Sequence, residues 1–214
     1  MELYLDGRKL DAPGSPSGSI DQTLRDVRRL HCAPNQLVVA LRCDDRDVPF
    51  AETASTLARP ASSLSKLEIF TSTGEQLVLG AMHQASQSLQ DSEAACTRVA
   101  QLLTEGQVNE ALTMLGECMR AWQKIHEAVV QSIRMLELDV ESAMINDTPF
   151  AEVIARPRDA LSQIKQALTR QDHVLLADLL QYELGGVTDQ WFALIARLRQ
   201  EAEDRERAPS EPRG

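Results

Sequence analysis

The most restrictive feature of the sequence is an apolar pattern that mirrors itself about Gly106. On both sides of this glycine, apolar or small residues recur at alternating intervals of three and four. Positions whose numbers sum to 214 correspond, so that Val99 matches Leu115 and Cys96 matches Cys118. Such spacing places one apolar stripe along a helix. The pattern predicts two antiparallel helices, joined by a tight turn, whose stripes pack together.

The two stripes predict which residues lie inside this hairpin. The first consists of Val78, Met82, Ala85, Leu89, Ser92, Cys96, Val99 and Leu103, and the second of Ala111, Leu115, Cys118, Trp122, Ile125, Val129, Ser132 and Leu136. In the mirror, the small Ser92 leaves room for Trp122. We predict helices over about 74–105 and 107–145 in a coiled-coil-like hairpin, with the longer second helix overhanging the first.

The remaining C-terminal sequence predicts two further helices of a bundle spanning 72–204. Asn146-Asp-Thr-Pro149 breaks the second helix, and Pro157 opens a third helix, 157–170. A fourth helix, 173–200, contains Gly185-Gly186, where we expect a kink or a close helix crossing. The end of the chain, 205–214, lacks apolar anchors and is predicted to be disordered.

The first 71 residues follow a different pattern, dominated by short alternating segments. Residues 1–10 predict a hairpin turning at Asp6-Gly7, 11–18 a loop, and Ser19 the start of a helix. A strand that we expect to be buried, 36–43, returns briefly over 46–49. After a connection, 66–71 alternates as the last strand.

This order of hairpin, helix, strand, short strand and strand resembles the β-grasp fold, of which ubiquitin is the familiar member. The resemblance covers residues 1–71 and rests on element order and spacing. Ubiquitin-like modifiers end in Gly-Gly after the last strand, whereas here Thr71 is followed by many more residues. The resemblance therefore implies a fused docking module rather than a conjugated tag. The predicted fold class is α+β, with a small β-grasp-like domain followed by an antiparallel helical bundle.

The charge distribution bears on the partners of the chain. The net charge is −10: residues 1–71 carry 9 Lys and Arg against 10 Asp and Glu, and residues 72–214 carry 13 against 22. An acidic helical half repels phosphate backbones, so we expect no nucleic-acid partner. No apolar run is long enough to span a membrane, and the N-terminus lacks the pattern of a signal peptide. Four cysteines without CxxC spacing suit a reducing cytoplasm.

The motifs that would carry catalysis or hold a metal are incomplete. His126-Glu127 begins like the zinc motif HExxH, but Val130 occupies the position of the second histidine. No histidine has a glutamate three residues before it, as a di-iron bundle requires. Cys32 and Cys43 lack further ligands at zinc-like spacing. We therefore predict no enzyme, no cofactor and no metal, and expect Cys96 and Cys118 to be two buried thiols, although their facing positions make a disulfide conceivable.

Two groups of residues are candidates for an interaction surface. Arg25, Arg28 and Arg29 form a cluster that would suit an acidic partner, although a solvated helix face is the simpler interpretation. Tyr182, Glu183 and Trp191 place aromatic and polar groups in one segment, as interfaces often do. The simpler interpretation there is that Trp191 fills the bundle core.

By elimination, the sequence predicts a non-enzymatic, adaptor-like protein for protein–protein interaction or scaffolding, with a partner whose identity the sequence does not give. The overhang of the second helix suggests a homodimer. The alternative function is that of a cytoplasmic chaperone of the type that serves secretion or flagellar export, since such proteins are also small, acidic and helical. A third class, an enzyme with a site assembled from distant residues, would show a deep polar pocket.

Overall fold

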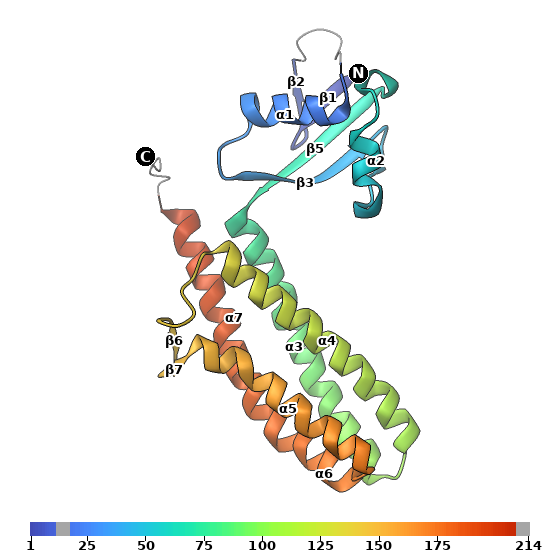
Figure 1. The fold of residues 1–214 in the computed structure, drawn as a ribbon, viewed down its shortest axis with the longest axis vertical. Helices are drawn as coiled ribbons and strands as arrows, with labels where there is room; N and C mark the ends of the chain where they lie inside the picture. Colours follow the sequence, from blue (N-terminus) through green and yellow to red (C-terminus); the bar gives the residue numbers. More distant parts are fainter. Residues whose placement is uncertain (12–17, 209–214) are drawn as a thin grey trace. The chain divides into compact units, whose positions relative to one another are not determined.

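The computed structural model describes residues 1–11 and 18–208 of the chain. The chain forms two compact units, Met1–Gly74 and Glu75–Gly214, and has the α+β fold class expected from the sequence. A five-stranded sheet dominates the first unit and long helices dominate the second (Figure 1). The predicted loop 11–18 falls largely on residues 12–17, which lie outside the described residues.

The first unit is a mixed sheet with the strand order β2-β1-β5-β3-β4. Its strands are β1 (Glu2–Leu5), β2 (Arg8–Leu10), β3 (Gln36–Cys43), β4 (Arg46–Asp47) and β5 (Lys66–Thr73). The central strand β5 runs parallel to β1 and antiparallel to β3. Both hairpins turn on two residues with positive φ, Asp6-Gly7 and Asp44-Asp45, which suits the right-handed twist of the strands.

Strand alternation gives the sheet one apolar face, which α1 (Ile20–His31) helps to cover. Paired positions place Leu3, Leu67 and Cys43 on this face, together with Leu41 and Ile69. Ile20 and Val27 of α1 join the same core. As the sequence suggests, Ser19 caps the helix, its Oγ accepting a hydrogen bond from the Gln22 N–H at 3.2 Å. Three short helical segments complete the unit: η1 (Phe50–Glu52), α2 (Thr53–Leu57) and η2 (Ala61–Ser63).

The second unit begins with the predicted helical hairpin, formed by α3 (Gly74–Thr104) and α4 (Val108–Met135) (Figure 1). Every residue of the two predicted stripes is buried. Gly106 has a φ of 79° and terminates α3: its N–H bonds Leu103 O, and the Gln107 N–H bonds Leu102 O. The mirror pattern therefore correctly predicts both the turn and the core of the hairpin.

The second helix ends at Met135, ten residues before the predicted residue 145. Glu137 adopts the left-handed conformation, with a φ of 49°, and closes the helix with bonds to Arg134 O and, from the next residue, to Ile133 O. A helix end of this kind normally carries glycine, so the sequence lacked the signal. The two helices have 31 and 28 residues, and the overhang on which the homodimer hypothesis rested is absent.

After α4, the small hairpin of β6 (Met144–Ile145) and β7 (Thr148–Pro149) leads into α5 (Phe150–Arg170). This helix starts seven residues before the predicted Pro157, which instead lies buried inside it. Proline lacks an N–H, so the carbonyl of Val153, four residues earlier, has no helical i+4 donor. The indole N–H of Trp191 donates to this carbonyl at 3.0 Å. A buried tryptophan thereby satisfies the group that the proline leaves unpaired.

The fourth predicted helix is continuous but irregular, and longer than expected. It consists of α6 (His173–Asp178), the π-helical turn η3 (Leu179–Glu183) and α7 (Leu184–Arg207). The irregularity lies just before Gly185-Gly186, and no atom lies close enough to either glycine to indicate a helix crossing there. Arg205–Arg207 are helical, which corrects the predicted tail, whereas 209–214 lie outside the described residues.

The hydrogen bond from the Trp191 indole to the Val153 carbonyl gives a prediction about stability. Trp191→Phe leaves this buried carbonyl without a donor and should lower the free energy of unfolding by about 1–3 kcal/mol. The loss should be smaller in a Pro157→Ala background, because the alanine N–H can bond Val153 O. Urea denaturation followed by tryptophan fluorescence measures both effects in the second unit, since Trp122 is present in every variant.

The matched control is Tyr182→Ala on an exposed side chain, which should change stability by less than about 0.5 kcal/mol. If the effects of Pro157→Ala and Trp191→Phe on the free energy of unfolding were additive, the Trp191 indole would not be replacing the N–H that Pro157 lacks.

Candidate interaction surfaces

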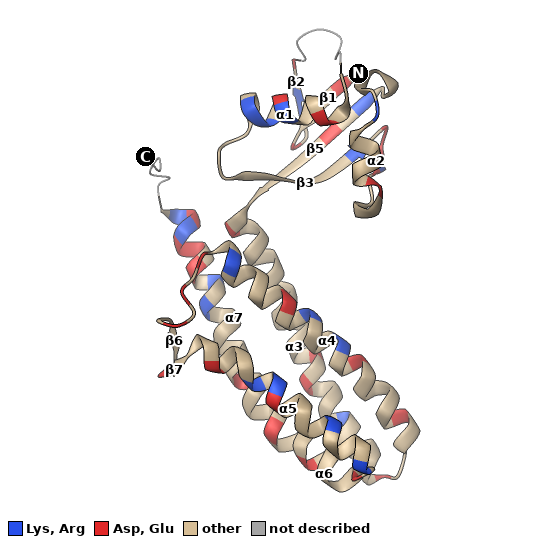
Figure 2. Ribbon diagram, in the orientation of Figure 1, with Lys and Arg blue, Asp and Glu red and all other residues tan. Residues whose placement is uncertain are grey.

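The three arginines predicted as a candidate surface lie in the middle and the C-terminal part of α1. Arg25, Arg28 and Arg29 are all exposed, at spacings that put them on adjoining turns (Figure 2). Arg25 pairs with Asp21 at 2.5 Å and Arg29 with Asp26 at 3.2 Å. Within the described part of the chain, no carboxylate lies at ion-pair distance from Arg28. Such exposed pairs are weak and open easily, so the cluster can accept an anionic group.

A hollow of about 400 Å³ adjoins this cluster. It is lined by the three arginines and by Cys32, Ala33 and Pro34, which follow α1. Burial raises the pKa of the Cys32 thiol, so this side chain is a neutral lining group near pH 7. Two hydrogen bonds tie Ala33 to Gln36, at 2.8 and 3.0 Å, and Gln36 is the first residue of β3. The hollow therefore adjoins the beginning of that strand.

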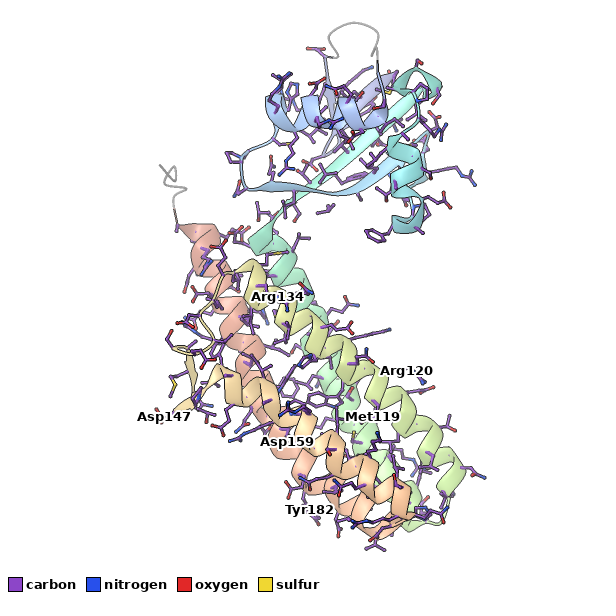
Figure 3. All side chains as sticks on the ribbon, viewed as in Figure 1. Met119, Arg120, Arg134, Asp147, Asp159 and Tyr182 are labelled. Carbon is purple, nitrogen blue, oxygen red and sulfur yellow. The ribbon has the colours of Figure 1, made fainter. Side chains whose placement is uncertain are left out.

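The second predicted group, Tyr182, Glu183 and Trp191, does not form one surface. Tyr182 is 68% exposed and lies at the periphery of the helical unit (Figure 3), and Glu183 is also exposed. Trp191 is 0% exposed, and its ring contacts Trp122 edge-on at 5.5 Å and stacks on His126 at 5.8 Å. The interpretation of Trp191 as a core residue is thus correct, and the surface prediction is wrong for this residue.

The free edge of β3 was missed from the sequence, which indicated a buried strand. Leu37 and Val38 are 37% exposed and Val39 is 46% exposed. On one side β3 pairs with β5, with a bulge between Val38 and Ala40. On the other side β4 pairs only with Arg42 and Cys43 of β3. One further hydrogen bond, 2.9 Å long, joins Val48 N to Leu41 O. No described residue pairs as a strand with 36–40 on this side.

A proline after the β3–β4 turn could have indicated from the sequence that this edge is open. Pro49 comes two residues after the end of β4, and a proline cannot donate to a strand ladder. A strand confined between Asp45 and Pro49 is too short to cover an eight-residue partner. The apolar run 37–41 suggested burial, but the length of the neighbouring strand decides how much of it is covered.

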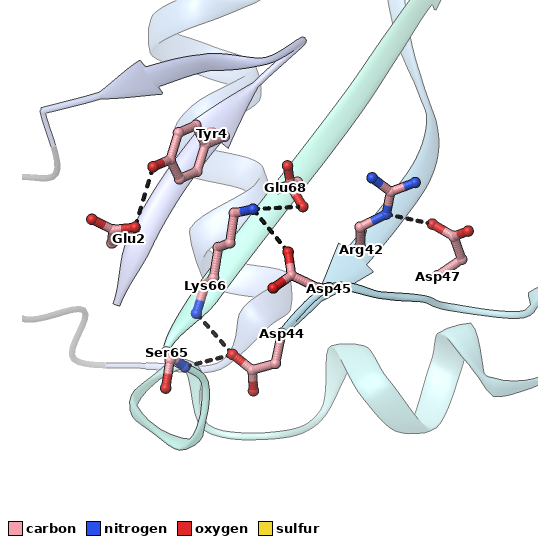
Figure 4. Close-up of polar contacts among 9 residues, drawn as sticks. All are labelled: Glu2, Tyr4, Arg42, Asp44, Asp45, Asp47, Ser65, Lys66 and Glu68. Atoms are coloured by element: carbon pink, nitrogen blue, oxygen red, sulfur yellow. Dashed lines mark hydrogen bonds and ion pairs between the residues drawn. The ribbon is translucent and has the colours of Figure 1, made fainter.

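The sheet face opposite α1 carries a polar network centred on Lys66 (Figure 4). Lys66 Nζ lies 2.9 Å from Asp45 and 3.2 Å from Glu68, and 5.2 Å from the centre of the Tyr4 ring. These hydrogen bonds raise the pKa of Lys66, and the bond from Lys66 lowers that of Asp45. Nearby, Arg42 pairs with Asp47 at 2.7 Å. Both cations of this network, Lys66 and Arg42, have a carboxylate partner, whereas in the arginine cluster Arg28 has none among the described residues.

Cys96 and Cys118 meet in the core of the helical hairpin, as the mirror pattern predicts. Both are free thiols, both are 3% exposed, and they share a hydrogen bond. This bond and burial raise the pKa of Cys96, whereas the same bond lowers the pKa of Cys118 against the effect of burial. The two thiols therefore titrate as a coupled pair, and ionisation of one thiol opposes ionisation of the other.

Within 1–11 and 18–208, no three His, Cys, Asp or Glu side chains lie close enough together to hold a metal ion. Over the same residues, no helix combines the length and apolarity that crossing a membrane requires.

The geometry defines an α+β protein with a filled helical hairpin and a sheet unit that carries an exposed basic hollow and a free strand edge. Residues 80–193 match the family described as a domain of unknown function, DUF8042, and the chain belongs to this family. The match runs from α3 into α7 and includes Cys96, Cys118, Pro157 and Trp191. The comparisons with curated proteins and with solved structures gave no significant match.

The different burial of the four cysteines predicts an order of thiol reactivity. Under native conditions, N-ethylmaleimide should modify the half-buried Cys32 first, while the buried Cys43, Cys96 and Cys118 react only on unfolding. Intact-mass and peptide mass spectrometry over time would measure this order. The same reaction in concentrated urea serves as the control, and early modification of Cys96 or Cys118 in the native protein would contradict the prediction.

The raised pKa of Cys96 predicts a loss of stability at alkaline pH. The unfolded chain ionises this thiol above about pH 8.5, whereas the folded chain keeps it protonated. Its contribution is therefore complete below that pH and decreases as the pH rises, by up to about 1.4 kcal/mol per pH unit. Urea denaturation at pH 7.5, 9 and 10 would measure the decrease.

The reference for this experiment is the variant Cys96→Ala/Cys118→Ala, in which the other titrating groups are unchanged. Its stability should fall less steeply above pH 8.5 than that of the natural protein. Parallel curves would show that the thiol pair does not contribute.

Proposed function

We propose that the protein is a non-enzymatic, adaptor-like protein of the cytoplasm whose Met1–Gly74 unit binds a partner protein. The strand order β2-β1-β5-β3-β4, with its single parallel pair, supports a β-grasp-like assignment of residues 1–71. In this proposal the sheet unit is the docking module and the helical unit is the scaffold that carries it. Four cysteines present as free thiols are in keeping with a reducing compartment.

The observation that carries the proposal is the apolar, unpaired edge of β3. Unpaired strand edges attract other chains, and natural proteins usually protect them with charges, prolines or cover. Between Gln36 and Leu41 there is no charged residue and no proline. Among its described residues, this small unit also has five exposed large apolar side chains, namely Leu30, Leu37, Val38, Val39 and Phe50. Three of these side chains, Leu37, Val38 and Val39, are consecutive on the open strand, and contiguous apolar exposure of this kind is typical of a binding surface.

The helical unit supports a scaffolding role because its interior is filled by its own side chains. The hairpin stripes, Phe150, Ile164 and Trp191 belong to one continuous apolar core. The arginine-lined hollow described above contains neither a histidine nor a carboxylate that would act as a general acid or base. These features favour binding over catalysis.

Site-specific photo-crosslinking in the native organism tests the proposal. A benzophenone amino acid placed at Val39 should yield a discrete adduct with one protein, identified by mass spectrometry and mapped to this position. The matched control is the same amino acid at Asp159, an exposed position on α5, where no such adduct is expected. Absence of an adduct at Val39, or equal adducts at both positions, would contradict the proposal.

The chaperone alternative has its own supporting observation. Val174 and Tyr182 are 74% and 68% exposed, and Leu175 between them is 39% exposed, all within the α6–η3 segment. An apolar client segment would be expected to bind there. A crosslinker at Tyr182 distinguishes the two functions, because an adduct at Tyr182 without one at Val39 would favour the chaperone.

A further inference from the structure

We infer that the occupant of the β3 edge is an extended acidic segment of the partner protein, which adds a strand beside 36–40 and places its carboxylates against the arginines of α1. This inference rests on the proposed function and specifies the chemistry of the partner. Three features of the sheet unit lead to it: the free edge, its apolar side chains and the charge beside it.

The free edge determines that the occupant is extended. Pairing by β4 stops at Arg42, Leu41 O accepts a hydrogen bond from Val48 N, and Gln36 N bonds Ala33 O. The backbone between these residues, 37–40, has no strand partner on that side among the described residues and can pair with an added strand. Main-chain hydrogen bonds of this kind bind a peptide in strand-addition complexes, and side-chain contacts select its sequence. Leu37, Val38 and Val39 are each more than one-third exposed and would contact apolar side chains of the occupant.

The neighbouring charge determines that the occupant is acidic. The hollow that leads into β3 is lined by three arginines, and its other lining residues, Cys32, Ala33 and Pro34, are uncharged. Arg28 has no carboxylate partner among the described residues, and the partners of Arg25 and Arg29 are weak surface pairs. Guanidinium groups bind carboxylates through paired hydrogen bonds, which would fix the register of the added strand.

A second copy of the chain is a poorer occupant of the same edge. Its own β3 would present Gln36-Leu-Val-Val-Ala40, which contains no carboxylate. Pairing of two such edges would satisfy the backbone, but these segments would bring no carboxylate to Arg28 of either copy. The charge complementarity therefore favours a different, acidic chain.

Selection from a random-peptide display library on the immobilised full-length protein tests the inference. The enriched peptides should contain aliphatic residues flanked by Asp or Glu, and the variant Arg28→Glu/Arg29→Glu should bind them about tenfold more weakly or worse. The matched control is Arg158→Glu, whose side chain is 83% exposed on α5 and which should bind them unchanged. Far-UV circular dichroism checks that each variant is folded.

The binding mode has a separate readout on the unaltered protein. The best peptide should slow hydrogen exchange at 36–40, and a version N-methylated on alternate amides should lose both this protection and its affinity. Enrichment of neutral or basic peptides, binding insensitive to the arginine reversal, or protection elsewhere would overturn the inference. A dimer of the free protein would also overturn the inference, if sedimentation shows that the peptide does not dissociate it and hydrogen exchange shows that its interface protects 36–40.

The crosslinking and peptide-selection experiments together distinguish failure of this inference from failure of the proposed function. A partner crosslinked at Val39 combined with selected peptides that lack acidic residues would preserve the adaptor function and reject the acidic occupant. Failure of both experiments would reject both.

Discussion

The helical unit depends on one hydrogen bond between two residues far apart in the sequence, from the Trp191 indole to the Val153 carbonyl. Pro157 deprives that carbonyl of its i+4 donor, and a buried carbonyl without a donor is costly. The tryptophan that supplies the donor also contacts Trp122 and His126, so one side chain links α7 to α4 and α5. The proline, a helix breaker in isolation, thereby becomes part of the packing between helices.

The ends of the helices show a similar division between local and non-local signals. Gly106 ends α3 with a left-handed glycine, which the sequence announces. Glu137 and Gln171 end α4 and α5 with the same backbone bonds but carry side chains that give no such signal. The prediction was therefore right at the first helix end and too long by ten residues at the second. The homodimer hypothesis lost its structural basis through this single boundary.

The two units also differ in how completely their polar and apolar groups are satisfied. In the helical hairpin both apolar stripes are buried, and the free thiols of Cys96 and Cys118 face each other as hydrogen-bond partners. In the sheet unit Lys66 and Arg42 have carboxylate partners, whereas residues 37–40 have no strand partner on one side, and Arg28 has no carboxylate partner, among the described residues. Unpaired backbone and unpaired charge favour binding, which is why we propose the sheet unit as the binding module rather than the aromatic segment around Tyr182.

The sequence by itself determined the α+β class, the hairpin about Gly106, its buried stripes and the meeting of Cys96 with Cys118, because helical periodicity and turn residues are local signals. It also indicated the order of strands and the arginine cluster on α1. Only the tertiary structure decided that the Trp191 indole bonds the Val153 carbonyl, that Pro157 lies within a helix and that β3 has an open edge. Each of these depends on a residue or strand distant in the sequence: Trp191 bonds a carbonyl on another helix, and the exposure of β3 depends on the length of β4.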